Sequence, residues 1–194
     1  MTGMEYGNIS EKYPTLITER LCLRPLTIQD AADIFEYASN PKIATYTVWY
    51  PHETLQDSQI FVQSILDQYE NGEIAAYGIE LKNEQKIIGT CGFIEYEENH
   101  HKAELAYALS PNYWGKGIAT EAARVCIRYG FETLQLNRIE ARCHASNVQS
   151  ERVMKRLGMQ YEGMLRKDMF VKGAYRDTKI YAILREEYDI QKGE

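Results

Sequence analysis

The sequence predicts a single mixed α/β domain over residues 1–194, with residues 1–13 expected to be flexible and 190–194 expected to form a tail. Stretches in which apolar and polar residues alternate, as in half-buried strands, are interleaved with stretches of helical periodicity. A strand–helix–strand crossover is expected in the middle of the chain, after three strands joined by short polar turns. The length suits one domain with a sizeable core, and no internal repeat divides it.

The first half of the chain is expected to supply one strand and two helices. The stretch "LITERLCLRPL" (16–26) alternates as a strand does. Thr27 is expected to cap a helix reaching about Ser39, with Asp30 as its capping-box partner. Four side chains of this helix are expected to face the core: Ala31, Ala32, Phe35 and Ala38. An irregular aromatic segment follows, and a second helix is expected from about Leu55 to Asn71.

The second half is richer in strands. Three are expected in succession, "AAYGIEL" (75–81), "KIIGTCGFIEYEE" (86–98) and "KAELAYAL" (102–109). A helix from Ile118, a strand "NRIEARCHA" (137–145) and a short helix "NVQSERVMKRLG" (147–158) form the crossover region. A long hairpin turning at Lys172-Gly173 comes last, and "LREEYDIQKGE" (184–194) is expected to be a solvated helix with a frayed end.

Composition excludes several classes of function. The net charge of −6 argues against nucleic acid as the main partner, because phosphate binding needs a basic face. No apolar run approaches the ~18–20 residues of a membrane span, and no secretory signal is recognisable, so a cytoplasmic location is expected. The four cysteines are far apart and are expected to be buried reduced thiols. His100 and His101 lie in a predicted turn without further ligands, so no metal is expected.

The stretch "YWGKGIATEA" (113–122) places two glycines where a helix must begin. Either the turn needs positive φ, or a ligand must approach this backbone closely. A strand that enters a helix through glycines presents unpaired N–H groups at the positive end of the helix dipole, which suits a phosphate. The spacing is neither that of a Walker loop nor that of a dinucleotide fingerprint. From the glycines alone, a plain turn and a phosphate site remain equally open.

Two separated motifs decide between these interpretations by resemblance. "SPNYWGKGIATEA" (110–122) followed by "ASNVQSERVMKRLGMQYEG" (145–163) resembles the GNAT acetyltransferase superfamily, and most closely its RimJ/RimL-type branch of protein N-terminal acetyltransferases. "ITERLCLRPLTIQDA" (17–31) and "GAYRDTKIYAIL" (173–184) are similar to the opening and closing elements of that branch. The resemblance implies a central twisted, mostly antiparallel sheet with splayed parallel strands at a coenzyme cleft and helices on both faces. It also implies acetyl-coenzyme A as cosubstrate and no metal.

The resemblance further implies which residues hold the coenzyme. The family's Q/R-x-x-G-x-G/A pattern falls on the glycine turn, where Trp114 stands apart from the usual pattern. Backbone amides expected to hold the pyrophosphate belong to Gly115, Lys116, Gly117, Ile118, Ala119 and Thr120. The pantetheine arm is expected along the strand edge of Tyr107, Ala108 and Leu109, and against Asn147. Asn147 can also cap its helix.

The catalytic residues are expected on the same elements. Glu104 is the candidate base, since "AELAYAL" resembles the branch's "AELGY" pattern; an exposed strand glutamate is the alternative, and Glu140 is the reserve. Met154 stands where many superfamily members have a tyrosine, and it cannot donate a proton usefully. Ser150, which fits the RimL-like branch, is expected to donate a hydrogen bond to the departing thiolate. By resemblance, an amide near Ala106 or Tyr107 stabilises the oxyanion.

The acceptor is expected to be an amine bound near Tyr46, Trp49 and Tyr50, although these aromatics could equally be core residues under a loop. A protein α-amino group, for example on a ribosomal protein, is the leading hypothesis, because it is far easier to deprotonate than a lysine side chain. A small amine such as a polyamine, an aminoglycoside or an amino acid analogue is the alternative. A non-catalytic sensor of acyl-coenzyme A is the third. The apolar closing strand "KIYAIL" (179–184) leaves room for a homodimer.

Overall fold

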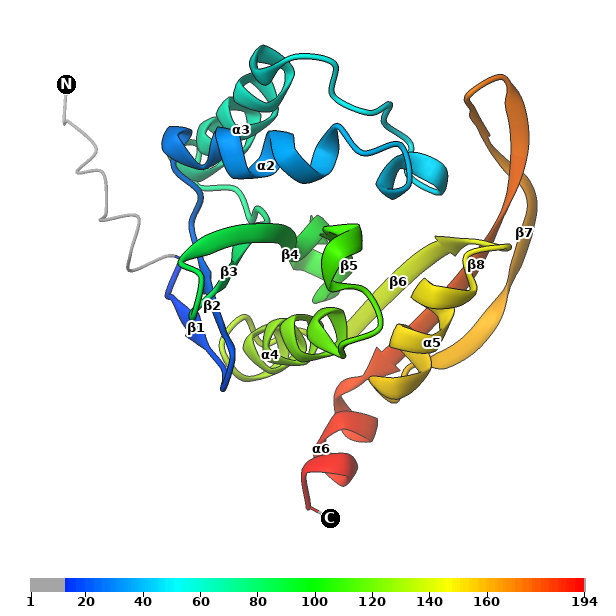
Figure 1. Cartoon of the computed structure of the whole chain (residues 1–194). Coiled ribbons are helices and arrows are strands. Elements are labelled where there is room, and N and C mark those ends of the chain that lie inside the picture. Colours follow the sequence, from blue (N-terminus) through cyan, green and yellow to red (C-terminus); the bar gives the residue numbers. More distant parts are fainter. Residues whose placement is uncertain (1–12, 194) are drawn as a thin grey trace, which may run out of the picture.

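The computed structural model describes residues 13–193, and Figure 1 shows how their strands and helices alternate. The strands are β1 (Leu16–Ile17), β2 (Leu21–Arg24), β3 (Tyr77–Leu81), β4 (Lys86–Glu97), β5 (Lys102–Leu109), β6 (Arg138–His144), β7 (Gln160–Val171) and β8 (Ala174–Leu184). The α-helices are α2 (Ala31–Ala38), α3 (Leu55–Glu70), α4 (Ile118–Glu132), α5 (Val148–Arg156) and α6 (Arg185–Gly193). Short 3-10 turns join some of them: η1 (Ile28–Asp30), η2 (Ile43–Thr45), η3 (Glu98–His100) and η4 (Pro111–Tyr113).

These strands form one sheet in the order β1-β2-β3-β4-β5-β6-β8-β7. Neighbours run antiparallel except β5 and β6, which are parallel. Figure 1 shows α2 and α3 on one face of the sheet and α4 on the other. The parallel pair follows from the crossover, because a helix between two adjacent strands returns the chain in the same direction. The predicted fold class is therefore confirmed.

The expected strand over residues 16–26 is in fact two strands. Thr18 N donates to Leu21 O at 3.0 Å, and this tight turn folds β1 back against β2. Residues 18–20 are thus a loop at the edge of the sheet. Three consecutive polar residues, 18–20, interrupt the alternation at this turn, and the predicted strand ran through this signal.

The helix after Thr27 begins as expected but buries a different face. Thr27 N donates to Asp30 Oδ2 at 2.7 Å, and the two residues form the predicted capping box. Ala32 is exposed and Phe35 is half-buried, contrary to prediction. The buried residues are Ala31, Ile34, Tyr37 and Ala38. Their spacing of three and four residues is an alternative phase of the same amphipathic pattern, with larger side chains in the core.

The cysteines and the two ends of the chain can be compared with the prediction. Cys91, Cys126 and Cys143 are buried, and Cys22 is half-buried, each within a strand or helix. Tyr13, at the end of the segment expected to be flexible, is buried, and its ring centroid lies 4.6 Å from that of Tyr69. Residues 1–12 and 194 lie outside the described residues, and 190–193 continue α6.

The strand suggested for a homodimer lies inside the sheet. Residues 179–184 belong to β8, which pairs with β6 on one side and with β7 on the other. Residues 179–182 are therefore paired on both sides and have no free edge for a strand of a second copy. Within residues 13–193, no helix has the combination of length and apolar character that crossing a membrane requires.

Candidate active site

The parallel strand pair opens into a cleft. β5 and β6 pair only from Lys102–Glu104 against Arg138–Glu140. Beyond that point they separate, while β5 stays paired with β4 and β6 with β8. The opening leads into a cleft of about 860 Å³, lined by β5, β6, the start of α4, α5 and the loop after α2. The expected splay of the parallel strands is therefore present.

The turn before α4 presents main-chain nitrogens to this cleft. Gly115 and Gly117 have φ angles of 76° and 77°, which favour glycine, and Gly117 is the N-cap of α4. Among the described residues, a Cβ on Gly115 would meet nothing within 4 Å, and one on Gly117 would meet only Arg20 Nη2 at 3.7 Å. After Trp114, the next described amide that donates to a main-chain acceptor is that of Glu121, which bonds Gly117 O at 3.0 Å. The open amides between them fit a diphosphate.

Nine of the ten residues expected at the coenzyme line the cleft. They are Tyr107, Ala108, Leu109, Gly115, Gly117, Ile118, Ala119, Thr120 and Asn147. Lys116 is the exception: its Nζ lies over the ring of Tyr113, 5.2 Å from the centroid. Ile118 buries its side chain in the core, so its amide is the group left for a ligand.

The β1–β2 turn braces the glycine turn, which sequence reasoning missed. Arg20 Nη1 donates to Lys116 O at 3.0 Å, and Arg20 Nη2 lies 2.6 Å from Glu121 Oε2. Thr18 Oγ1 donates to the other oxygen of Glu121 at 2.6 Å. The negative charge of Glu121 is thereby balanced by Arg20 at the helix N-terminus, where it would otherwise compete with a bound phosphate. The residues are about 100 positions apart in sequence and belong to no short motif, so only the fold reveals this contact.

The N–H and C=O groups of successive residues in β5 point alternately toward β4 and toward the open edge of the strand. Ser110 N donates to Ile88 O at 2.8 Å, which continues the β4–β5 ladder. Because hydrogen-bonded pairs alternate in an antiparallel ladder, Ala106 and Ala108 direct their N–H and C=O groups to β4, and Tyr107 and Leu109 direct theirs to the gap. Tyr107 is thus better placed than Ala106 to stabilise an oxyanion.

Trp114, which departs from the family pattern, has a structural role at this edge. Its indole Nε1 donates to Leu109 O at 2.7 Å. The bond ties the glycine turn to the end of β5. It also occupies one of the two main-chain groups that Leu109 directs to the gap, which leaves its N–H for a ligand.

The start of α5 brings a serine hydroxyl to the cleft. Asn147 caps the helix, and its Oδ1 accepts from Ser150 N at 3.1 Å. Ser150 Oγ lies 2.8 Å from the hydroxyl oxygen of Tyr107 on β5. Met154 is fully buried in the core, so no side chain reaches the cleft from that position. Ser150 and Tyr107 are therefore side-chain donors on opposite walls of the cleft.

Two carboxylates lie side by side where β5 and β6 part. Glu104 and Glu140 are register partners, with side chains 13% and 12% exposed. Burial raises the pKa of Glu104 to about 7, although Arg142, 3.2 Å away, acts in the opposite direction. Burial acts on Glu140 too, but hydrogen bonds from Arg142 and Arg138 outweigh it and lower its pKa. Glu104 can therefore exchange a proton near neutral pH, and Glu140 stays an anion.

The position of Glu104 relative to the cleft follows from the strand. Side chains three residues apart on a strand point to opposite faces, so Glu104 and Tyr107 flank the sheet from either side. Glu104 does not line the 860 Å³ cleft itself. A coenzyme in the cleft and a base on the opposite face can meet at the gap between β5 and β6.

The aromatic loop after α2 is only partly at the cleft. Tyr46 lines it, and its ring lies 5.5 Å from that of His144 on β6. Trp49 packs against the core beside His52, which is the alternative left open from sequence. Tyr50 is 67% exposed and lies under the ammonium group of Lys172, at the β7–β8 turn. Lys172 Nζ also donates to the carbonyl oxygens of Ala44 and Thr47, which fastens the hairpin to this loop.

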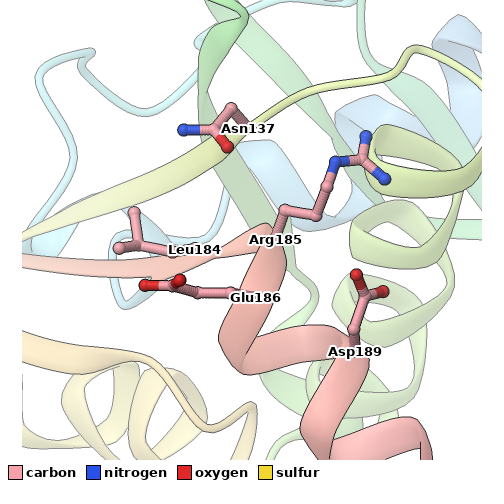
Figure 2. A pocket seen from close by; sticks show the side chains of 5 residues that line it. All are labelled: Asn137, Leu184, Arg185, Glu186 and Asp189. Carbon is pink, nitrogen blue, oxygen red and sulfur yellow. The ribbon is translucent and has the colours of Figure 1, made fainter.

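A smaller pocket lies at the start of α6, as Figure 2 shows. Its volume is about 280 Å³, and it is lined by Asn137, Leu184, Arg185, Glu186 and Asp189. Arg185 Nη2 donates to Phe131 O at 2.8 Å and to Leu136 O at 2.7 Å. These bonds anchor α6 to the end of α4 and give Arg185 a structural role. None of the expected site residues lines this pocket.

Comparisons with known proteins agree with this geometry. Residues 20–160 match the family described as "Acetyltransferase (GNAT) domain". The chain is 37% identical over 174 residues to the N-acetyltransferase p20 of Bacillus licheniformis, covering 90% of this chain and 98% of that one. It is 29% identical over 167 residues to the spermidine N(1)-acetyltransferase of Escherichia coli K12, covering 86% and 87% of the two chains.

Solved structures give the same answer. A GNAT-family acetyltransferase from Bacillus anthracis superposes with a TM-score of 0.80 at 31% identity, covering 89% of this chain and 99% of that one. The ribosomal-protein-S5-alanine acetyltransferase from Vibrio fischeri superposes with a TM-score of 0.78 at 25% identity, covering 89% and 97%. The chain belongs to the GNAT acetyltransferase family. It is an N-acetyltransferase, for which acetyl-coenzyme A is the implied acetyl donor.

Proposed function

We propose that the acceptor is the α-amino group of a peptide or protein N-terminus, which attacks the thioester directly in a ternary complex. The observation that carries this proposal is Glu104, a largely buried carboxyl whose pKa burial raises to about 7. An α-amino group with a pKa of about 7.7–8.0 gives up its proton to such a base at a cost of only about 1 kcal/mol. A lysine side chain with a pKa of about 10.4 would cost about 5 kcal/mol.

Each group then has one role. The ammonium form of the acceptor first loses a proton to Glu104, which passes it to solvent; Glu104 then accepts the second N–H proton from the attacking amine as the new C–N bond forms and the C–S bond breaks. The amide of Tyr107, directed to the gap, stabilises the oxyanion. Ser150 donates a hydrogen bond to the leaving sulfur, which departs as a thiolate and is later protonated by solvent. The amides of residues 115–120 and the side chain of Asn147 hold the coenzyme.

The charge of the cleft bears on the choice of acceptor. Among residues 13–193, its lining contains four basic side chains, Lys42, Arg142, Arg152 and Arg156, and no aspartate or glutamate. Such a lining attracts the phosphates of a coenzyme and repels an acceptor with several positive charges. A polyamine is therefore the second candidate. It is favoured by the name of one relative, the spermidine N(1)-acetyltransferase, and by the net charge of −6.

A panel of acceptors tests the proposal. Thiol release from acetyl-coenzyme A is measured with peptides that begin with serine or alanine, with the same peptides acetylated at the N-terminus, and with spermidine. We expect kcat/KM at least tenfold higher for the free peptides than for spermidine, and no release with blocked peptides. Preference for spermidine would replace the peptide by the polyamine. Absence of thiol release with every amine would overturn the proposed function.

A further inference from the structure

A tyrosine and a serine from opposite walls of the cleft form a contact to which nothing above assigns a purpose. Tyr107 Oη lies 2.8 Å from Ser150 Oγ and 3.2 Å from Ser150 O. Tyr107 comes from the part of β5 that has left β6, and Ser150 from the first turn of α5. The pair therefore spans the cleft beside the opening where the thioester is expected.

The direction of the hydrogen bond decides what Ser150 can do. A serine hydroxyl has one proton and can donate it to one acceptor at a time. If Ser150 donates to Tyr107, it has no proton left for a departing sulfur. If Tyr107 donates to Ser150 Oγ, the proton of Ser150 is free and the serine oxygen is held in place.

The geometry is consistent with the second direction, because the hydroxyl oxygen of Tyr107 lies nearer to Ser150 Oγ, at 2.8 Å, than to Ser150 O, at 3.2 Å, the other acceptor it can reach. Burial raises the pKa of its phenol well above the ordinary value, so the phenol keeps its proton and remains a donor. Such a phenol is too weak an acid to protonate the sulfur itself. The cap beneath it adds rigidity, because Asn147 Oδ1 accepts from Ser150 N at 3.1 Å and fixes the backbone from which the hydroxyl projects.

We propose that Tyr107 is a positioning residue that donates its hydroxyl proton to Ser150 Oγ and thereby directs the hydroxyl hydrogen of Ser150 toward the leaving sulfur. This inference rests on the proposed function. No proton is transferred along the pair: the C–S bond breaks to give a thiolate, Ser150 stabilises it by a hydrogen bond, and the proton of the amine goes to Glu104. A preoriented donor lowers the barrier because it needs no rearrangement as charge develops.

The test is a double-mutant cycle on Tyr107→Phe and Ser150→Ala. Steady-state thiol release is measured with a peptide acceptor, and the Kd for acetyl-coenzyme A is measured by calorimetry. We expect each single variant to lower kcat by roughly 10- to 100-fold with Kd within about twofold of the wild type. We expect the double variant to equal Ser150→Ala, because Tyr107 acts only through the serine. Tyr188→Phe is the matched control: it removes a hydroxyl bonded to Glu132 at 3.0 Å, far from the cleft, and should leave kcat unchanged.

Three outcomes would overturn the inference. Tyr107→Phe with normal kcat shows that the hydroxyl is dispensable. A double variant whose loss is the product of the two single losses shows that Tyr107 acts independently of Ser150. A loss of kcat that is matched by an equal loss of coenzyme affinity shows that the hydroxyl maintains the cleft and has no role in positioning. In all three cases the wild type still turns over, so the proposed function survives; a wild type without activity overturns both.

Discussion

Replacing Glu104 by Gln removes the titratable group where β5 and β6 part while keeping the size of the side chain. Its pKa rises from its ordinary value of 4.5 to about 7 in the folded chain. The folded state therefore binds this proton more tightly than the unfolded state. The wild type loses stability as pH rises from about 4.5 to about 7, and the variant does not.

The size of the effect follows from the same two values. At ~1.4 kcal/mol per pKa unit, Glu104→Gln should gain about 1 kcal/mol over the wild type at pH 5 and about 3 kcal/mol at pH 8. Urea unfolding across this pH range measures the difference. Glu140→Gln is the control with the opposite sign: its pKa is lowered, so its loss should destabilise the fold near neutral pH, and the deficit should shrink as pH falls below about 4.5.

The same variant tests the role of Glu104 in turnover. A base with a pKa of about 7 makes kcat/KM rise with pH through that value, because the deprotonated form is the active one. Glu104→Gln should lower kcat by roughly 10²- to 10⁴-fold and leave the Kd for acetyl-coenzyme A unchanged. A stability difference that is flat from pH 5 to 8 would refute the buried-carboxyl argument. Near-normal turnover would refute the assignment of the base.

Two further predictions concern the cleft walls. Gly117→Val should weaken acetyl-coenzyme A binding at least tenfold, as measured by calorimetry, because the methyl groups of valine would fill the space over the open amides. Gly173→Val is the control: Gly173 has a similar φ of 75° at the hairpin turn, so this variant should bear the same backbone strain and still bind acetyl-coenzyme A with the affinity of the wild type. Lys172→Met should speed chymotrypsin cleavage after Tyr46 and Trp49, since it releases the carbonyls of Ala44 and Thr47, whereas Lys167→Met on the same hairpin should not; equal rates would show that the bonds from Lys172 do not hold this loop in place.

The sequence predicted the fold class and the glycine turn before α4 because local signals carry both. Period-two alternation locates β5, and helical periodicity starts at Ile118, where the structure also begins α4. The glycine turn requires positive φ, which few residue types adopt, so its position is readable without a fold. Resemblance then supplied the ligand, which periodicity alone could not name.

What the sequence could not predict depends on contacts between distant segments. The bonds from Arg20 to the glycine turn join residues about 100 positions apart, and no pattern links them. The reversal at Thr18 depends on the pairing of β1 with β2, which the three polar residues at 18–20 permit but do not specify. The direction of the Lys116 side chain could not be predicted either: its charge suggests contact with a phosphate, yet its ammonium group lies over the ring of Tyr113. Side-chain direction at exposed positions is set by neighbours that only the folded chain defines.

The end of the β5–β6 ladder accounts both for the cleft and for the difference in pKa between Glu104 and Glu140. The register that stops at Glu104 and Glu140 leaves two carboxylates adjacent where the gap begins. Arg142 contacts both, but of the two carboxylates only Glu140 also receives hydrogen bonds from Arg138, at 3.0 and 3.2 Å, and Arg138 bonds Glu162 as well. Glu140 therefore stays ionised, and its negative charge, together with that of Glu95, helps burial to raise the pKa of Glu104. Uneven sharing of two arginines thus separates two identical side chains into an anion and a group that titrates near neutral pH, at the point where the gap between β5 and β6 begins.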